Sequence, residues 1–547
     1  MSTSAIPRTD TMTSTAPTSS STPNVLSPTP TINGDVDNTY DKVEPSPTTD
    51  GARDPAQKVI MSQKKKWFLL GVFSLAFFID IWSYSAFFIF TGPISNDLSV
   101  DFAQQSWVIT SYAVTFSAFL LLWGRVSDLF SAKPVFAFGF IALGVLNLVI
   151  SFLPDKYSFF VLRAVSGIAG AALIPAAFRL IVAVFEPHEL GKAFTIYGMS
   201  GAVANTTGII VAGFVEYIPN KGQMVAWRWF FRILAAVILP FALGSLYWIP
   251  APAPRTTPLN NVWKRLDLVG SLSMLFGIIL LILGLTLGAS DGWRTPGFLV
   301  PFLLSFVLFP FFFIWESRIP AEYALLPPAT WRIPNFAILI AFALYIYAWW
   351  SLNFLPFIET FVRVHGDIAI IAAVRMLPQG IAAGAITIFL TLYPQYVARP
   401  RWPIVIGMVA GLVGYVLFIF SEGMVGDHYW KFIFTGSVIG SAGTMLVFTA
   451  TNVGVMTSVP PEMAGVAGAV LQVALQVGSA VALSIQAGLL TIEPGNLTNW
   501  VNVRISYIFV LGWGVIWLVG FLVFYKPGRK LSKEEQAEQG ERVVAHM

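Results

Sequence analysis

The sequence contains no cysteine, and only 11% of its 547 residues are Asp, Glu, Lys or Arg, whereas soluble domains average about 25%. The absence of cysteine excludes disulfides, thiolate metal sites and a cysteine nucleophile. The four histidines show no spacing typical of a metal site, and the sequence has no nucleotide-binding loop, nucleophile elbow or zinc motif. We therefore predict that the chain is not an enzyme and binds no cofactor or metal.

The sequence is rich in long apolar runs. Hydrophobic residues make up 56% of the chain, and the mean hydropathy is +0.70. Fourteen apolar windows between Trp67 and Tyr525 have the length of about 20 residues that spans a bilayer; counts of thirteen or twelve are alternatives. These windows predict an all-α membrane protein with two six-helix bundles and two inserted transmembrane helices. The predicted parts are a disordered cytoplasmic tail (1–60), an N-terminal bundle (61–250), a linker with the inserted helices (251–335), a C-terminal bundle (336–525) and a second cytoplasmic tail (526–547).

The basic residues predict the orientation of the spans, because loops rich in Lys and Arg stay in the cytoplasm. With fourteen spans both termini are cytoplasmic, and one set of basic residues falls on that side: Lys64 to Lys66, Arg125, Lys133, Lys192, Lys264, Arg265, Arg318, Arg332, Arg399, Arg401, Arg529 and Lys530. Because they lie in short loops, we expect a lipid bilayer around the chain and no nucleic acid partner. The sequon at Asn496 falls in an outer loop, where glycosylation can occur. We expect the plasma membrane as the location, with a vacuolar or other internal membrane as the alternative.

Asp80 and Arg163 are charged residues inside predicted spans, where charge is costly and its default interpretation is functional. Asp80 is in the middle of the first span, and Arg163 is near the outer end of the fourth. Their comparable depth lets them pair across the bundle, and a carboxylate that titrates there would act as a proton switch. The alternatives are a structural tie between helices for Asp80, and a fixed ion pair or an arginine reaching the membrane surface for Arg163.

A charged loop between the second and third spans, GRVSDLFSAKP, is a candidate gate. Gly124 allows another helix to approach closely. Asp128 can lie against a helix N-terminus, where a negative charge is favoured, and we expect that terminus to belong to the span beginning near Met463. Lys133 can hold the loop in place. A generic charged loop would show a similar pattern.

Polar and aromatic side chains within the spans are candidates for lining a cavity. Each of them is individually more often an interhelical hydrogen bond or an interfacial anchor. In the second bundle, Gln379, Tyr347 and Trp350 accompany the residues that we select. The selected residues are Trp107, Tyr112, Tyr345, Trp349, Asn353, Arg375, Asn452, Gln472 and Gln476.

These motifs resemble the major facilitator superfamily, and within it the fourteen-span drug:proton antiporters, over Trp67 to Tyr525. GRVSDLFSAKP is similar to the superfamily's loop signature, although Ser131 and Ala132 replace its usual glycine and basic residue. RAVSGIAGAAL resembles the fourth-span motif, whose arginine is implicated in proton coupling. GIIVAG (208–213) departs from the fifth-span antiporter motif, because Ile209 stands where that motif has proline. The Ser/Thr-rich tail and IPAAFRLI are similar to those of fungal exporters.

The resemblance implies alternating access around a central cavity and export of an amphipathic small organic compound by proton antiport. Asp80 would take the proton, Arg163 would sense its charge, and Asp128 would lock the inner gate. The expected partners are a small-molecule substrate and protons, and the expected oligomeric state is a monomer. One alternative is an importer or facilitator of a small polar solute, which the Ile209 departure leaves open. The other is a membrane sensor that does not transport.

Overall fold

The computed structural model describes residues 61–100, 104, 107–216, 218, 222–250, 265–320, 323–397, 399–422, 424, 426–460, 463–495 and 498–526. The predicted tail 1–60, residues 527–547 of the second tail and the sequon residue Asn496 therefore lie outside the described residues.

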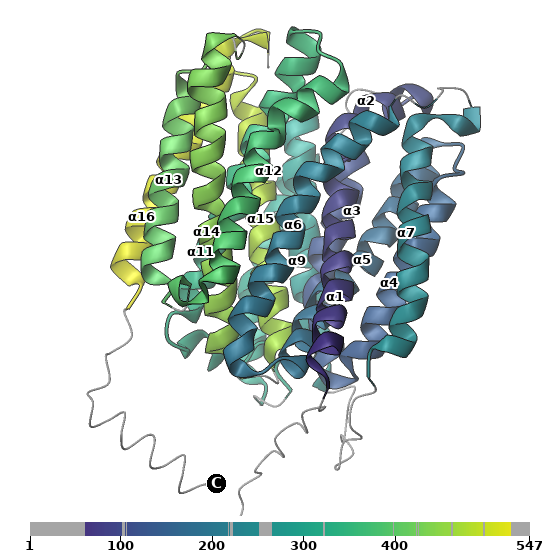
Figure 1. Ribbon diagram of the computed structural model, residues 1–547, viewed down its shortest axis with the longest axis vertical. Helices are drawn as coiled ribbons and strands as arrows, with labels where there is room; N and C mark the ends of the chain where they lie inside the picture. Colours follow the sequence, from purple (N-terminus) through teal and green to yellow (C-terminus); the bar gives the residue numbers. More distant parts are fainter. Residues whose placement is uncertain are drawn as a thin grey trace, which may run out of the picture. The chain divides into compact units, whose positions relative to one another are not determined.

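The regular secondary structure of the described residues is helical (Figure 1). Fourteen of the helices are long and apolar enough to cross a membrane. The predicted all-α membrane fold with fourteen spans is therefore confirmed, and the chain is an integral membrane protein. The main helices are α1 (Gln63–Ser85), α2 (Phe87–Asp97), α3 (Trp107–Leu129), α4 (Ala132–Ile150), α5 (Lys156–Val184), α6 (Pro187–Val215), α7 (Ala226–Trp248), α9 (Leu268–Asp291), α10 (Pro296–Arg318), α11 (Phe336–Glu359), α12 (Ala369–Leu392), α13 (Arg401–Ile419), α14 (Thr435–Ser458), α15 (Ala464–Leu489) and α16 (Trp500–Phe524).

Polar residues at the helix ends explain where several spans begin. Asp155 caps α5 by accepting hydrogen bonds from the backbone N–H groups of Tyr157 (3.0 Å) and Ser158 (2.9 Å). Glu186 and Glu189 form a capping box at the start of α6. Asn499 caps α16 in the same way as Asp155 caps α5. These side chains satisfy backbone donors that the first helical turn leaves unpaired.

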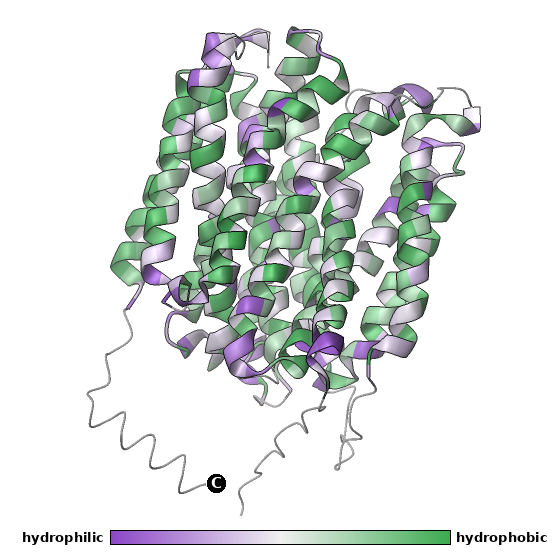
Figure 2. Ribbon diagram, in the orientation of Figure 1, coloured by the Kyte–Doolittle hydropathy of each residue, from purple (hydrophilic) through white to green (hydrophobic). Residues whose placement is uncertain are grey.

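The hydropathy along the helices follows the expected bilayer. Figure 2 shows mostly hydrophobic residues along the middle of the helices and hydrophilic ones gathered at their ends. Only 17% of the apolar window of α10 is buried in the protein, against 72% for α15. Large apolar side chains of α10, such as Val300, Phe306 and Val307, are exposed. Lipid is the solvent that suits this helix.

Helices from the two halves of the chain pack against each other along two seams. One seam joins α3 to α15, and the other joins α6 to α12 and α14. The inserted helix α9 packs against both α3 and α15, and α10 packs against α9. The predicted division of the chain into two bundles and an inserted pair stays a prediction, but α9 covers the α3–α15 seam.

Candidate functional site

A cavity lies between helices of both halves of the chain. Its free volume is about 90 Å³. This volume holds a few water molecules and is smaller than the roughly 300–1,000 Å³ of typical small-molecule pockets, so a bound compound would require it to widen. It is lined by Phe77, Asp80, Ile81, Tyr84, Phe88, Tyr112, Ala113, Phe116, Gly198, Gly201, Ala202, Asn205, Thr206, Tyr347, Trp350, Ser351, Phe354, Gln379, Gly380, Ala383, Ser441, Met445, Phe448, Gln476 and Ser479.

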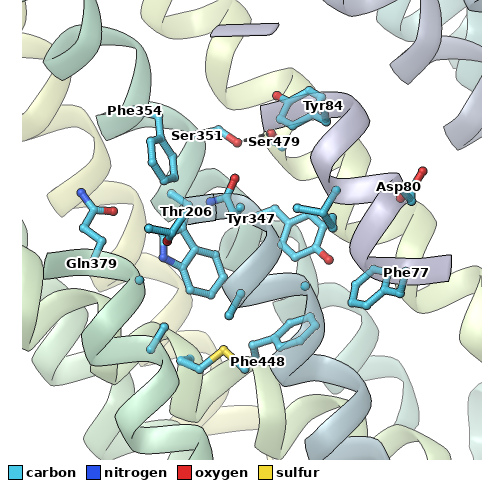
Figure 3. A pocket seen from close by; sticks show the side chains of 18 of the residues that line it. Phe77, Asp80, Tyr84, Thr206, Tyr347, Ser351, Phe354, Gln379, Phe448 and Ser479 are labelled. Carbon is cyan, nitrogen blue, oxygen red and sulfur yellow. Dashed lines mark hydrogen bonds between the residues drawn. The ribbon is translucent and has the colours of Figure 1, made fainter. Parts of the chain in front are cut away.

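The chemistry of this lining is aromatic, with a few hydrogen-bonding groups and one charge. Figure 3 shows the rings of Phe77, Tyr347 and Phe448, with Asp80 to one side. Among the described lining residues, Asp80 is the only Asp, Glu, Lys, Arg or His. The Ser351 and Ser479 hydroxyls bond to each other at 2.6 Å. Such a surface suits an amphipathic molecule that needs one polar anchor.

Asp80 and Arg163 come to the same place, with Tyr112 between them. Asp80 is 3% exposed, and its Oδ1 accepts a hydrogen bond from the Tyr112 hydroxyl. The Arg163 guanidinium lies over the Tyr112 ring, 4.8 Å from its centroid. In the described part of the chain no direct ion pair joins the two charges. Tyr112 therefore contacts both the acid and the base.

Further contacts hold Arg163 in a fixed position, 1% exposed. Its guanidinium lies 4.0 Å from the centroid of the Phe87 ring, a cation–π contact. Its Nη2 donates to the Ser83 carbonyl at 3.0 Å. That carbonyl belongs to the last turn of α1, where carbonyl groups lack an intrahelical partner. Arg163 thus joins α5 to the point where α1 ends and α2 begins.

The cavity face of α11 differs from the face that we selected. Tyr347, Trp350, Ser351 and Phe354 line the cavity at the i, i+3, i+4, i+7 spacing of one helix face. Trp349 instead donates from its Nε1 to the Gly411 carbonyl of α13, at 3.0 Å. Tyr345 packs against Trp513 of α16, as part of the interior behind α11.

The remaining selected residues divide between the cavity and its surroundings. Tyr112 and Gln476 line the cavity. Three more lie behind lining residues: Asn353 accepts from Gln379 (3.0 Å), Gln472 accepts from Tyr347 (3.5 Å), and Asn452 donates to the Phe448 carbonyl (3.1 Å). Two lie apart from the lining: Arg375 is paired with Asp367, and Trp107 is the partly exposed first residue of α3.

Several polar lining residues escaped the sequence-based selection. Asn205 and Thr206 of α6 belong to the cavity, as do Ser351, Ser441 and Ser479. Asn205 and Thr206 form part of a sequon within a span, where glycosylation is excluded. Their presence in an apolar helix was itself a signal, because polar groups in spans tend to face the interior.

The candidate gate loop lies at the other end of α3. The Asp128 carboxylate accepts from Arg179 Nη1 at 2.7 Å and from the backbone N–H of Val466 at 3.0 Å. Val466 is in the first turn of α15, so the carboxylate lies at the helix N-terminus that we expected. Arg179 was not among the predicted gate residues. Lys133 lies in the first turn of α4 and is partly buried.

Gly124 allows the two halves to approach closely at this gate. A Cβ added at Gly124 would lie 2.9 Å from Ala469 Cβ and 3.2 Å from the Gly465 carbonyl oxygen. Any larger residue would force α3 and α15 apart. In this structure α3 and α15 are in close contact at the candidate gate. Among the described residues, no three His, Cys, Asp or Glu side chains gather to hold a metal ion.

Comparison with known proteins agrees with this geometry. The chain is 29% identical to the puromycin resistance protein pur8 of Streptomyces alboniger, over 72% of this chain and 75% of that protein. It is 24% identical to the major facilitator superfamily multidrug transporter mfsC of Aspergillus fumigatus, over 85% and 88%. The fold is similar to that of a proton:xylose symporter (TM-score 0.61, 12% identity, 85% of this chain and 97% of that one). Residues 73–483 match the sequence profile of the Major Facilitator Superfamily. The chain therefore belongs to the Major Facilitator Superfamily, and it is a membrane transporter of small molecules and not an enzyme.

Proposed function

We propose that this transporter exports an amphipathic organic compound in exchange for protons. The observation that carries the proposal is the placement of Asp80. It is a buried carboxylate and the only such charge among the described lining residues of an otherwise aromatic cavity. An intramembrane acid of this kind is typical of a proton relay or a substrate site.

The surroundings of Asp80 support proton coupling. Tyr112 contacts both Asp80 and Arg163, so a change in the charge of Asp80 alters the electrostatic environment of Arg163. Arg163 is bonded in turn to the last turn of α1. Loss or gain of one proton at Asp80 is thereby linked to the end of α1, next to α2, whose Phe88 lines the cavity.

The close contact at the candidate gate supports alternating access. Asp128 holds the N-terminal turn of α15 from the other half of the chain. Opening this end requires that contact to break. The names of the relatives, a puromycin resistance protein and a multidrug transporter, support export as the direction.

The test is the substitution Asp80→Asn, assayed with puromycin and ethidium in cells. We expect wild-type protein to lower accumulation of a transported probe, and the variant to lose this activity while staying folded and inserted. The control is Asp291→Asn, the same chemical change at an exposed position at the end of α9. Wild-type pH dependence in Asp80→Asn would show that the proton site lies elsewhere.

A second candidate is uptake of a small polar solute, favoured by Ile209 at the position where the fifth-span antiporter motif has proline. Ile209 is 1% exposed within α6. The direction of flux in reconstituted vesicles with an imposed proton gradient separates the two candidates.

A further inference from the structure

The inserted helices α9 and α10 are tied together at the end of the molecule that carries Asp128, which we call the gate end. Asp267 precedes α9 in a left-handed conformation, with φ of 43°. Its Oδ1 accepts from the Gly270 backbone N–H at 3.1 Å and from Trp315 Nε1 at 2.8 Å. Trp315 is in the last turn of α10. The start of α9 is therefore held against the end of α10.

The segment that follows α10 is folded back on that helix. Glu316 is 2% exposed, and its two carboxylate oxygens accept from the backbone N–H groups of Leu325 and Leu326, both at 3.2 Å. The N–H groups of Tyr323 and Ala324 bond to the Pro320 carbonyl. The Tyr323 carbonyl is thus held in a defined position.

One arginine of α3 contacts both ends of this hairpin. Arg125 Nε donates to the Arg265 carbonyl at 2.7 Å, and Arg125 Nη2 donates to the Tyr323 carbonyl at 3.3 Å. Arg265 lies two residues before Asp267, the α9 cap, and Tyr323 follows α10. The planar guanidinium fork suits two acceptors at once, which a lysine ammonium does not match. Arg125 also follows Gly124 and lies three residues before Asp128.

We propose that Arg125 is a positioning residue of the inner gate, which ties the inserted hairpin to α3 and so stabilises the closed state. The α9 helix packs against both α3 and α15. When the gate opens, α3 and α15 separate at this end, and α9 can follow only one of them. Because Arg125 ties the hairpin to α3, opening removes the packing of α9 against α15. That packing, present only while the gate is closed, supplies the free-energy difference between the two states that a shift of population requires.

The test uses spin labels on cysteines at Phe130 and Thr457, because the chain has no native cysteine. Both positions are exposed, one after α3 and the other in the last turn of α14. Their distance distribution reports how far the halves are apart at the gate end. The critical variant is Glu316→Ala, which releases the Tyr323 segment without changing any residue of α3 or the Asp128 contact. We expect it to raise the open population several-fold, as Arg125→Gln should.

The double variant decides the mechanism. If Glu316 acts through Arg125, Glu316→Ala combined with Arg125→Gln raises the open population no further than the larger single change. The control is Ser317→Ala, the exposed neighbour of Glu316 on α10, which should match wild type. If Glu316→Ala folds poorly, Glu316→Gln keeps one acceptor oxygen and should give a smaller shift in the same direction.

Two outcomes would overturn the proposal: a folded Glu316 variant with the wild-type distance distribution, or fully additive effects in the double variant. The inference rests on the proposed function only in taking Asp128 as the inner gate. Because the distances are measured without substrate or proton gradient, loss of proton coupling in Asp80→Asn leaves this test intact. The two proposals can therefore fail separately.

Discussion

Among single residues, Tyr112 is the one that connects the two charged side chains of the central site, Asp80 and Arg163. Its hydroxyl bonds to Asp80, and its ring lies under the Arg163 guanidinium. Arg163 is kept from a direct ion pair with Asp80 and donates its own hydrogen bond to the Ser83 carbonyl. A charge change at Asp80 therefore reaches the end of α1 through two side chains, one from α3 and one from α5.

The sequence predicted the two charges but not the phenol between them. An acid or an arginine within an apolar span stands out by its cost. Tyr112 resembles many other aromatic residues in these spans, and we assigned it to the substrate cavity. Which side chain reaches across a bundle depends on helix rotation, and composition does not encode that rotation.

A residue-scale prediction concerns Asp155, which caps the helix that carries Arg163. Hydrogen bonds, first from Ser158 and also from the Tyr157 amide, hold the pKa of Asp155 below its ordinary value of 3.8. A carboxyl with a lowered folded-state pKa stabilises the protein fully above the unfolded-state value, and loses this effect as pH falls through the lower, folded-state value. We expect Asp155→Ala to unfold at a lower temperature than wild type at pH 7, with the gap closing below about pH 4.

Thermal unfolding in detergent between pH 7 and pH 3 measures this effect. Asp155→Asn is the matched control, because asparagine caps a helix about as well as aspartate and does not titrate. A gap between Asp155→Ala and wild type that stays constant over this range would contradict the prediction.

For the helices, the hydropathy of the sequence predicted the positions of the spans well, but it predicted their exact ends and their cavity-facing sides poorly. The apolar window of the second inserted span covers residues 298–314, whereas the helix runs over Pro296–Arg318. The apolar window of the last span begins at residue 505, but α16 begins at Trp500, where Asn499 caps a first turn that contains Asn502. The break at Ala86 between α1 and α2 has no signal in an apolar run. The same holds for the cavity face of α11, since a helix that is hydrophobic all round shows no preferred side.

The closeness of α3 and α15 yields a prediction for this pair of helices. Gly124→Ala places a Cβ 2.9 Å from Ala469 Cβ. Excess volume in a packed interface costs about 1–3 kcal/mol, and ~1.4 kcal/mol is a tenfold change in an equilibrium. We expect the substitution to shift the resting population roughly tenfold toward the state with an open gate end.

The rate at which a thiol reagent labels a cysteine placed in the inner vestibule measures this shift. The control is Gly512→Ala in α16, where an added Cβ meets nothing within 4 Å. Labelling of the Gly124→Ala variant at the wild-type rate would argue that the gate end is not held closed by this contact.

For the whole molecule, the fourteen spans predict that both termini are on the cytoplasmic side. An even number of crossings returns the chain to its starting side, and the basic loops alternate accordingly. We expect tags at either terminus to be protected in intact cells and a tag in the loop between α15 and α16 to be accessible. Protection of the α15–α16 loop would contradict this topology.

Because α10 is exposed to lipid along most of its length, the thickness of the membrane can affect the gate. Its 23 residues span about 35 Å, somewhat more than the roughly 30 Å of a typical hydrocarbon core. A thinner bilayer would tilt this helix, which meets lipid along most of its length. Its gate end carries Trp315 and Glu316, which fix the segments that Arg125 binds. Lipid chain length would therefore influence how readily the closed state forms, without any lipid entering the cavity.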